Sequence, residues 1–253
     1  MANNKTTWWA ALFVLACAGA QEFPLRSVQI PDAPSLLLAH FDGTLLDEIS
    51  GNEAKASGPL PFCRGKFGKG VFFPRDSKEI LSFAPKLPWA EGAGTLSLWI
   101  RLDWEPRTNV TSGRTIVDIF TRNEKANRAR LYLYANGEKS PGTHLFLVLS
   151  DAAGKSISHG VDLGQDAKWR AGDWHHLVVS WMSGKGIVFA LDGAAQKIGK
   201  PGENWEMDLT ACEIFVGMPF YAASRLAQGK PVPPLEGALD ELMISRQALL
   251  AFP

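Results

Sequence analysis

The feature of this sequence that most constrains its fold is a long series of short apolar or alternating segments, separated by glycine, proline, asparagine and aspartate. Alternation predicts β-strands, because successive side chains of a strand point to opposite faces. Pairs such as Asn136-Gly137 and Asp192-Gly193 favour tight turns, because these residues tolerate a positive φ. The predicted strands cover residues 35–41, 70–73, 79–83, 94–102, 115–120, 130–134, 144–149, 156–161, 174–181, 186–191, 196–198, 212–216 and 237–244.

Helices are nearly missing from the same pattern. After residue 20 the best short helical candidate is 221–228, which ends at Gly229. Many strands without intervening helices predict an all-β, antiparallel two-sheet sandwich or a barrel. A chain of 253 residues is long enough for one large domain of this class.

The amino terminus has the order of a secretory signal. Lys5 supplies positive charge, residues 8–16 are apolar, and Ala18-Gly19-Ala20 offers a small-residue cleavage site. Residues 14–17 also resemble a bacterial lipobox that ends at Cys17, so soluble export and a lipid-anchored form both stay open. We therefore expect a signal peptide over 1–20, a proline-containing leader over 21–34, one domain over 35–253, and a secreted, periplasmic or cell-surface location.

Charge and hydropathy narrow the range of partners. Lys plus Arg and Asp plus Glu each number 26, so no net field gathers nucleic acid or an acidic membrane surface. No segment of the mature chain approaches the roughly 20 apolar residues of a membrane-spanning helix. We expect neither a nucleic-acid partner nor a transmembrane helix.

Five segments carry a resemblance to a known family. They are LLLAHFDGTLLDEISGNEA (36–54), GKFGKGVFF (65–73), GTLSLWIRL (94–102), GDWHHLVVSWMSGKGIVFALDG (172–193) and GALDELMISRQAL (237–249). In this order they resemble the laminin-G-like jelly-roll domains of the concanavalin A-like lectin/glucanase superfamily. The resemblance implies a jelly-roll sandwich in which the last strand pairs with the first.

Glycosidases also occur on this architecture, so we tested the sequence for their catalytic motif. Retaining glucanases of this fold carry E-x-D-x-x-E on one strand, and the nearest match runs from Glu206 through Asp208 to Ala211. Ala211 has no carboxyl group to protonate a leaving oxygen. His175 and His176 are adjacent on a predicted strand, so they point to opposite faces and cannot chelate one ion together. We expect a protein that is not an enzyme.

An acidic pair suggests a metal site. Asp240 lies among core residues of the last strand, and the paired first strand delivers Asp42. Oxygen ligands of this kind suit Ca²⁺, and related jelly rolls often carry a structural calcium. The alternative is that Asp240 accepts backbone N–H bonds or pairs with Arg101 or Arg246.

Two cysteines, Cys63 and Cys212, remain in the folded part of an exported chain. They form either one disulfide or two separate buried thiols.

Aromatic residues in predicted turns are the candidates for ligand binding. They are Trp89, Trp104, Trp205 and Tyr221, together with Trp169. An exposed Trp stacks on the apolar face of a sugar ring, whereas a buried one only caps the core. We expect an exported, non-catalytic binding module for glycan or a protein surface at or outside the cell envelope. The alternatives are a glycoside hydrolase or lyase with an unfamiliar catalytic set, and a structural or assembly protein.

Overall fold

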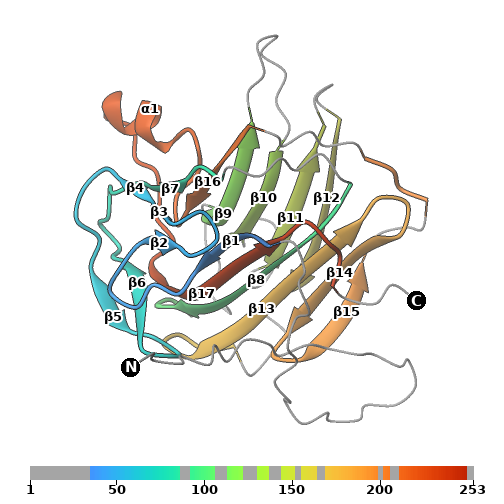
Figure 1. The fold of residues 1–253 in the computed structure, drawn as a ribbon, viewed down its shortest axis with the longest axis horizontal. Coiled ribbons are helices and arrows are strands. Elements are labelled where there is room, and N and C mark those ends of the chain that lie inside the picture. The colour runs from blue at the N-terminus through green and yellow to red at the C-terminus, as the bar shows by residue number, and fades with distance from the viewer. Residues whose placement is uncertain are drawn as a thin grey trace, which may run out of the picture.

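Two large antiparallel sheets dominate the described part of this chain (Figure 1). The computed structural model describes residues 35–85, 92–105, 113–121, 130–136, 144–151, 155–163, 169–198, 202–205 and 211–249. A two-stranded sheet of β2 (Leu46–Asp47) and β3 (Asn52–Glu53) and one short helix, α1 (Ala222–Ala227), complete the described part. The predicted all-β, two-sheet antiparallel sandwich is confirmed.

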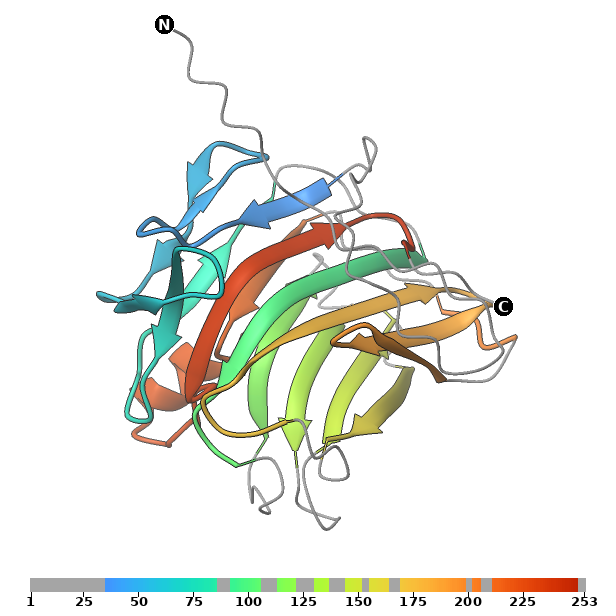
Figure 2. The same ribbon diagram turned by 90° about the horizontal axis from the view of Figure 1, so that it is seen from below.

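The first sheet has eight strands in the order β15-β14-β13-β8-β17-β6-β5, with β1 also paired to β17. Its strands are β1 (Ser35–Ala39), β5 (Phe62–Arg64), β6 (Lys69–Phe73), β8 (Ala93–Leu102), β13 (Trp174–Met182), β14 (Gly186–Leu191), β15 (Ala194–Ile198) and β17 (Gly237–Ser245). Figure 2 shows β17, β8 and β13 as long, bowed strands that lie side by side.

Strand β17 changes partner along one edge. Its first residues pair with β6, from Gly237 to Leu239, and its last residues pair with β1, from Leu242 to Ser245. The register against β8 shifts between Asp240 and Met243, which marks a β-bulge at the change of partner. The predicted pairing of the last strand with the first is confirmed.

The second sheet has seven strands in the order β12-β11-β10-β9-β16-β7-β4. Its strands are β4 (Lys55–Ala56), β7 (Leu81–Phe83), β9 (Arg114–Thr121), β10 (Arg130–Asn136), β11 (His144–Ser150), β12 (Ser156–Asp162) and β16 (Cys212–Val216). Consecutive strands β9 to β12 form a meander, whereas β16 and β7 join from distant parts of the chain.

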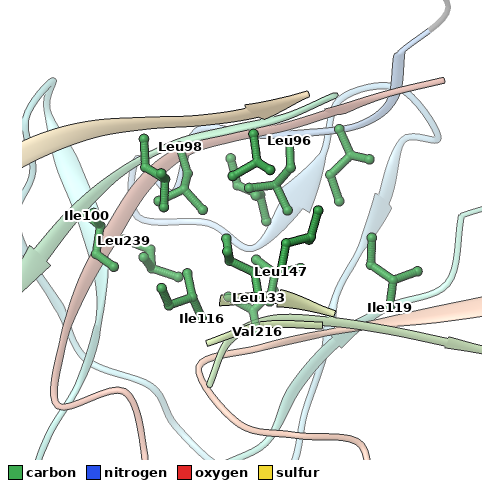
Figure 3. Close-up of a cluster of buried hydrophobic side chains, with 14 of the residues drawn as sticks. Leu96, Leu98, Ile100, Ile116, Ile119, Leu133, Leu147, Val216 and Leu239 are labelled. Carbon is green, nitrogen blue, oxygen red and sulfur yellow. The ribbon is translucent and has the colours of Figure 1, made fainter. Parts of the chain in front are cut away.

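The core lies between the two sheets and follows from alternation. Figure 3 shows Leu96 and Leu98 of β8 pointing toward Leu133 and Leu147 of the opposite sheet. These four side chains are at most 1% exposed. Full burial of one such side chain stabilises the fold by about 1.5–3 kcal/mol. Alternate residues of the same strands point away from the core and form the outer faces.

Several sequence-based expectations are met in this architecture. The predicted meander over 174–198 is β13-β14-β15, and the short helical candidate at 221–228 is α1. No helix in the described ranges is long and apolar enough to cross a membrane. The predicted signal peptide, Cys17 and the leader lie outside the described residues.

Candidate functional site

The outer face of the seven-stranded sheet carries a row of aromatic rings. On β10, Leu133 faces the core, and Tyr132 and Tyr134 point outward. On β11, the core leucines alternate with His144 and Phe146, which point outward. We call Tyr132, Tyr134, His144 and Phe146 the aromatic face.

The rings of the aromatic face stack in series. The ring centroids of Tyr132 and Tyr134 are 4.6 Å apart, those of Tyr134 and Phe146 are 5.4 Å apart, and those of Phe146 and His144 are 5.7 Å apart. Gly160, on the neighbouring β12, makes room for this row. A Cβ at that position would come within 2.7 Å of the Phe146 ring.

Polar groups border the rings. The hydroxyls of Thr115 and Tyr132 are hydrogen-bonded at 3.1 Å, and His144 Nε2 lies 3.8 Å from the carboxylate of Asp162. Asp118 is the register partner of Tyr132 on β9, but it is fully buried, and its Oδ2 accepts a hydrogen bond from the Phe220 N–H at 2.9 Å. The face therefore combines apolar rings with hydroxyl and carboxylate groups.

A third carboxylate lies on the far side of Asp118. Glu213 points outward from β16, and its Oε1 accepts a hydrogen bond from the Ser82 hydroxyl at 2.7 Å. The outer face therefore has acidic groups on β9, β12 and β16.

These residues were not among the sequence-predicted ligand-binding candidates, which were aromatic residues in turns. The signal was present in the alternation, since Tyr132, Tyr134 and Phe146 occupy the polar phase of strands whose other phase is leucine. A bulky aromatic on the solvent-facing phase of a strand is the pattern that would have found them.

The predicted acidic pair lies on the outer side of the other sheet. Asp240 is fully buried at the β17 bulge, and its Oδ2 accepts a hydrogen bond from the Phe67 N–H at 2.8 Å. Its Oδ1 is buried and has no hydrogen-bond partner. Asp42 accepts a hydrogen bond from the Lys69 N–H at 2.8 Å. Burial raises the pKa of Asp240 to about 7, and the charges of Glu241 and Asp42 add to the rise.

These residues do not fit a Ca²⁺ site. In the ranges that the structure describes, no three His, Cys, Asp or Glu side chains are placed to hold one ion. Backbone N–H groups already point at one oxygen of Asp240 and one of Asp42, and they would repel a cation. Calcium stays a prediction that this arrangement does not support, and the backbone N–H bonds match the alternative considered for Asp240.

Next to Asp240, a histidine joins two glutamates. His40 Nδ1 lies 2.9 Å from Glu241 Oε2, and its Nε2 lies 3.2 Å from Glu48 Oε2. Burial alone would lower the pKa of His40, but the two carboxylates outweigh it and the net pKa is raised. The contact between His40 Nδ1 and Glu241 Oε2 also holds the side chain of Glu241, a residue whose backbone has a positive φ of 56°.

The two adjacent histidines of β13 point to opposite faces, as expected. His175 Nδ1 pairs with Asp192 at 2.7 Å, and its ring stacks on Trp169 at 4.2 Å. His176 stacks on Trp99 at 5.0 Å, and burial lowers the pKa of His176 to about 4. Both rings have structural partners in the fold.

Most of the predicted ligand-binding aromatics are not exposed. Trp205 is only 6% exposed and Trp169 only 1%, so neither ring offers a free face. Trp104 packs against the core, and its Nε1 donates to the Leu235 carbonyl at 3.1 Å. Tyr221, just before α1, is exposed, and Trp89 lies outside the described residues. Trp205 is therefore wrong as a ligand-binding candidate, and both Trp205 and Trp169 match the alternative in which a buried ring caps the core.

Cys63 and Cys212 are separate thiols, and the disulfide alternative is wrong in this structure. Cys63 belongs to β5 of one sheet and Cys212 to β16 of the other, so the core separates them. Burial raises the pKa of Cys212 to about 12, which keeps the thiol protonated. Glu206 and Asp208 of the incomplete glucanase motif lie outside the described residues.

Comparison with known proteins agrees with the fold. A laminin-G family model, described as the concanavalin A-like lectin/glucanases superfamily, matches residues 77–251. Comparison with curated proteins gives no significant match.

Solved structures show the same fold at low sequence identity. Domain 4 of a GH43 extracellular arabinanase from Geobacillus stearothermophilus, in complex with arabinotriose, has 16% identity and a TM-score of 0.57, covering 86% of this chain and 94% of that chain. The botulinum neurotoxin serotype D ligand binding domain, in complex with N-acetylneuraminic acid, has 14% identity and a TM-score of 0.58. The match covers 85% of this chain and 48% of that chain. The receptor binding domain of botulinum neurotoxin mosaic serotype C/D has 13% identity and a TM-score of 0.61. The match covers 87% of this chain and 49% of that chain. The chain thus spans about half the length of these toxin domains.

Proposed function

Because the chain belongs to the concanavalin A-like lectin/glucanase superfamily, we propose that it is an exported, non-catalytic module whose aromatic face binds glycan. The observation that carries this proposal is the row of rings from Tyr132 to His144, bordered by hydroxyl and carboxylate groups. Aromatic rings pack against the apolar face of a sugar, and the bordering oxygens accept hydrogen bonds from its hydroxyls. Two of the similar folds were solved with arabinotriose and with N-acetylneuraminic acid, which supports a sugar as the class of ligand.

The charge of the face favours a neutral sugar chain. Asp162 and Glu213 bring two partly exposed carboxylates to the outer face of the seven-stranded sheet, and Asp118 on β9 is fully buried beneath it. Like charges brought together at an interface cost binding energy, so an acidic sugar is disfavoured. A neutral chain instead gains hydroxyl-to-carboxylate hydrogen bonds.

Binding to a polysaccharide panel tests this proposal. We expect the purified protein to be retarded in affinity gels that contain a neutral polysaccharide such as arabinan, dextran or hydroxyethyl cellulose. Tyr134→Ala or Phe146→Ala should weaken that retardation by about tenfold or more, because loss of an aromatic anchor costs about 1.4 kcal/mol or more.

Phe67→Ala is the matched control. Phe67 is also a surface aromatic, 53% exposed, but it lies in the β5–β6 loop of the other sheet. This variant should bind as the wild type does. Equal loss in all three variants would argue against the aromatic face, and release of reducing sugar from a bound polymer would overturn the non-catalytic assignment.

Export has its own test. The small-residue site Ala18-Gly19-Ala20 supports cleavage that leaves Gln21 first, whereas the lipobox reading supports a lipid on Cys17. The mass of the mature amino-terminal peptide from expressing cells distinguishes these two forms. A mature protein that begins at Met1 would contradict export.

A further inference from the structure

The connection from β16 to α1, residues 217–221, lies on the outer face of the seven-stranded sheet and covers part of β9. Asp118 and Phe120 point outward from β9, yet they are only 0% and 8% exposed, whereas Tyr132 on the neighbouring β10 is partly exposed. The Phe220 N–H donates to Asp118 Oδ2 at 2.9 Å, and the Phe220 ring stacks on the Phe120 ring with the centroids 3.9 Å apart. The connection therefore stands directly beside the aromatic face.

Both ends of the connection are held in place. Gly217 begins it with a left-handed φ of 72°, and a Cβ there would come within 2.5 Å of the Phe73 ring, so the turn requires glycine. Met218 is fully buried and packs with Ala222 at the start of α1. Because Phe220 between them is bound to β9, the connection has one defined position on the sheet.

Tyr221 is the residue that this connection presents to solvent. Three large hydrophobic side chains of the described residues are well exposed, at 42% for Ile49, 53% for Phe67 and 37% for Tyr221. Ile49 lies between β2 and β3, and Phe67 lies in the β5–β6 loop of the other sheet. The Tyr221 ring meets the Phe220 ring at 82°, with the centroids 5.4 Å apart. Of the three exposed side chains, Tyr221 is therefore the one beside the aromatic face.

A line of direct neighbours joins Tyr221 to the aromatic face. Tyr132 is the register partner of Asp118, which binds the Phe220 amide next to Tyr221 in the chain. Adjacent strands lie about 4.8 Å apart, so this line crosses the sheet from strand to strand. Glu213 points outward from β16, the strand next to β9, and supplies a partly exposed carboxylate beside the line. A ligand that touches both Tyr132 and Tyr221 must follow this line, so it contains several linked sugar units.

On the premise of the proposed function, we infer that Tyr221 is a second sugar-binding position and that the ligand is a chain of several neutral units crossing the strands. The aromatic face binds one part of the chain, and the Tyr221 ring packs against a later unit. Asp118 and Phe220 are positioning residues, because they hold Tyr221 in place from beneath. The second contact adds affinity without a second loss of translational freedom, so longer chains bind more tightly.

Fragments of different length test this inference. The polymer that retards the protein, whether arabinan, dextran or hydroxyethyl cellulose, is partly hydrolysed and fractionated, and NMR titration gives a dissociation constant for each length. For the wild type, affinity should rise by at least about tenfold from fragments of about two or three units to fragments of about eight to ten units. Signals of the aromatic face should shift with every fragment, and signals of Tyr221 only with the longer ones.

Variants separate the two positions. Tyr221→Ala should remove most of the gain with length and leave the affinity for the shortest fragments within about twofold of wild type, whereas Tyr134→Ala should weaken both. Tyr221→Phe keeps the ring and should keep the gain. Ile49→Ala removes a side chain of similar exposure far from this line and should change nothing.

The failures of the two proposals differ. Retardation by a polymer with an affinity that does not rise with length, or a full gain in Tyr221→Ala, would overturn the second position and leave the aromatic face in place. A loss in Tyr221→Phe as large as that in Tyr221→Ala would overturn the packing of the ring on sugar. Retardation by none of the three polymers would overturn the proposed function, and the second position with it.

Discussion

Gly68 has a left-handed backbone, with a φ of 63°, and lies against the carboxylate of Asp42. Gly229 has a similar φ of 69°, but a Cβ there would meet nothing within 4 Å. Alanine substitutions at these two glycines therefore distinguish the free-energy cost of a left-handed backbone from the free-energy cost of steric overlap.

We predict that Gly229→Ala lowers the free energy of unfolding by about 1–2 kcal/mol, which is the cost of a left-handed non-glycine residue. Gly68→Ala should lower it by about 1–3 kcal/mol more, because the new methyl group overlaps Asp42. Urea unfolding followed by circular dichroism measures both values. Equal losses would show that the loop moves aside freely.

His40 makes part of the stability depend on pH. Its folded pKa is raised above the ordinary value, so the stability that it contributes is fully present below pH 6.5 and is lost as the pH rises through the folded pKa. We predict that the difference in unfolding free energy between wild type and His40→Gln shrinks as the pH is raised from 5.5 to 9. Denaturant unfolding across that range gives the result, and a constant difference would contradict the role of His40.

Single residues were predictable from sequence where local geometry decides their place. The opposite directions of His175 and His176 follow from strand alternation alone, and Asp42 and Asp240 were correctly expected near each other. Burial of Trp205 was not predictable, because residues next to it in sequence are polar while its contacts, such as Ser183, come from a distant turn.

Strand β1 shows how an element is positioned by one face. Leu37 is fully buried against the core, and Leu38 is only partly buried on the strand's other side. Both residues pair with β17, through Ile244 and Met243.

We predict that Leu37→Gln lowers the free energy of unfolding by at least about 2 kcal/mol, because an amide without partners enters the core. Leu38→Gln should cost less than about 1 kcal/mol, since that side chain reaches solvent. Thermal and urea unfolding of the two variants compare the two faces directly. A larger loss in Leu38→Gln would mean that the strand's register against β17 is wrong.

At the scale of elements, the long strands were predictable and the short ones were not. β8 shows clear apolar alternation over ten residues, and β13 is a nine-residue run that is mostly apolar on both faces. β2, β3 and β4 contain two residues each, which is too few to display any period. Their positions depend on pairing with distant strands, as β4 does with β7.

At the scale of the molecule, the two outer faces differ in character. The aromatic face is bordered by carboxylates, whereas the opposite sheet carries Trp99 and the β5–β6 loop with Lys66 and Lys69. A charged ligand should therefore distinguish the two faces.

We predict that carboxymethyl-dextran binds at least about tenfold more weakly than unmodified dextran, because added carboxylates approach Asp162 and Glu213. Glu213→Gln and Asp162→Asn should reduce this difference, and Glu53→Gln, on the two-stranded sheet, should leave it unchanged. Affinity electrophoresis at low ionic strength measures the ratio. Preference for the carboxymethyl form would show that the ligand class is acidic, even if the aromatic face still binds it.

The fold as a whole was predictable because alternation and the five ordered segments agree from residue 36 to residue 249. The candidate site could not be predicted, because the order of the strands in the sheet decides which outward-pointing residues become neighbours. β16 enters the second sheet between β9 and β7, and no local pattern places Glu213 beside the meander that carries Tyr132 and Tyr134.

The pairing of β1 with β17 also sets the order in which the molecule can be completed during synthesis. Ser35 and Ser245 are register partners, so almost the whole chain must be made before β1 finds its place. Contacts between such distant residues form slowly, because a long loop has to close first. A ribosome that has not yet released residues 242–245 therefore holds a chain whose first strand is still unpaired. The sandwich is closed only after its last strand has been translated.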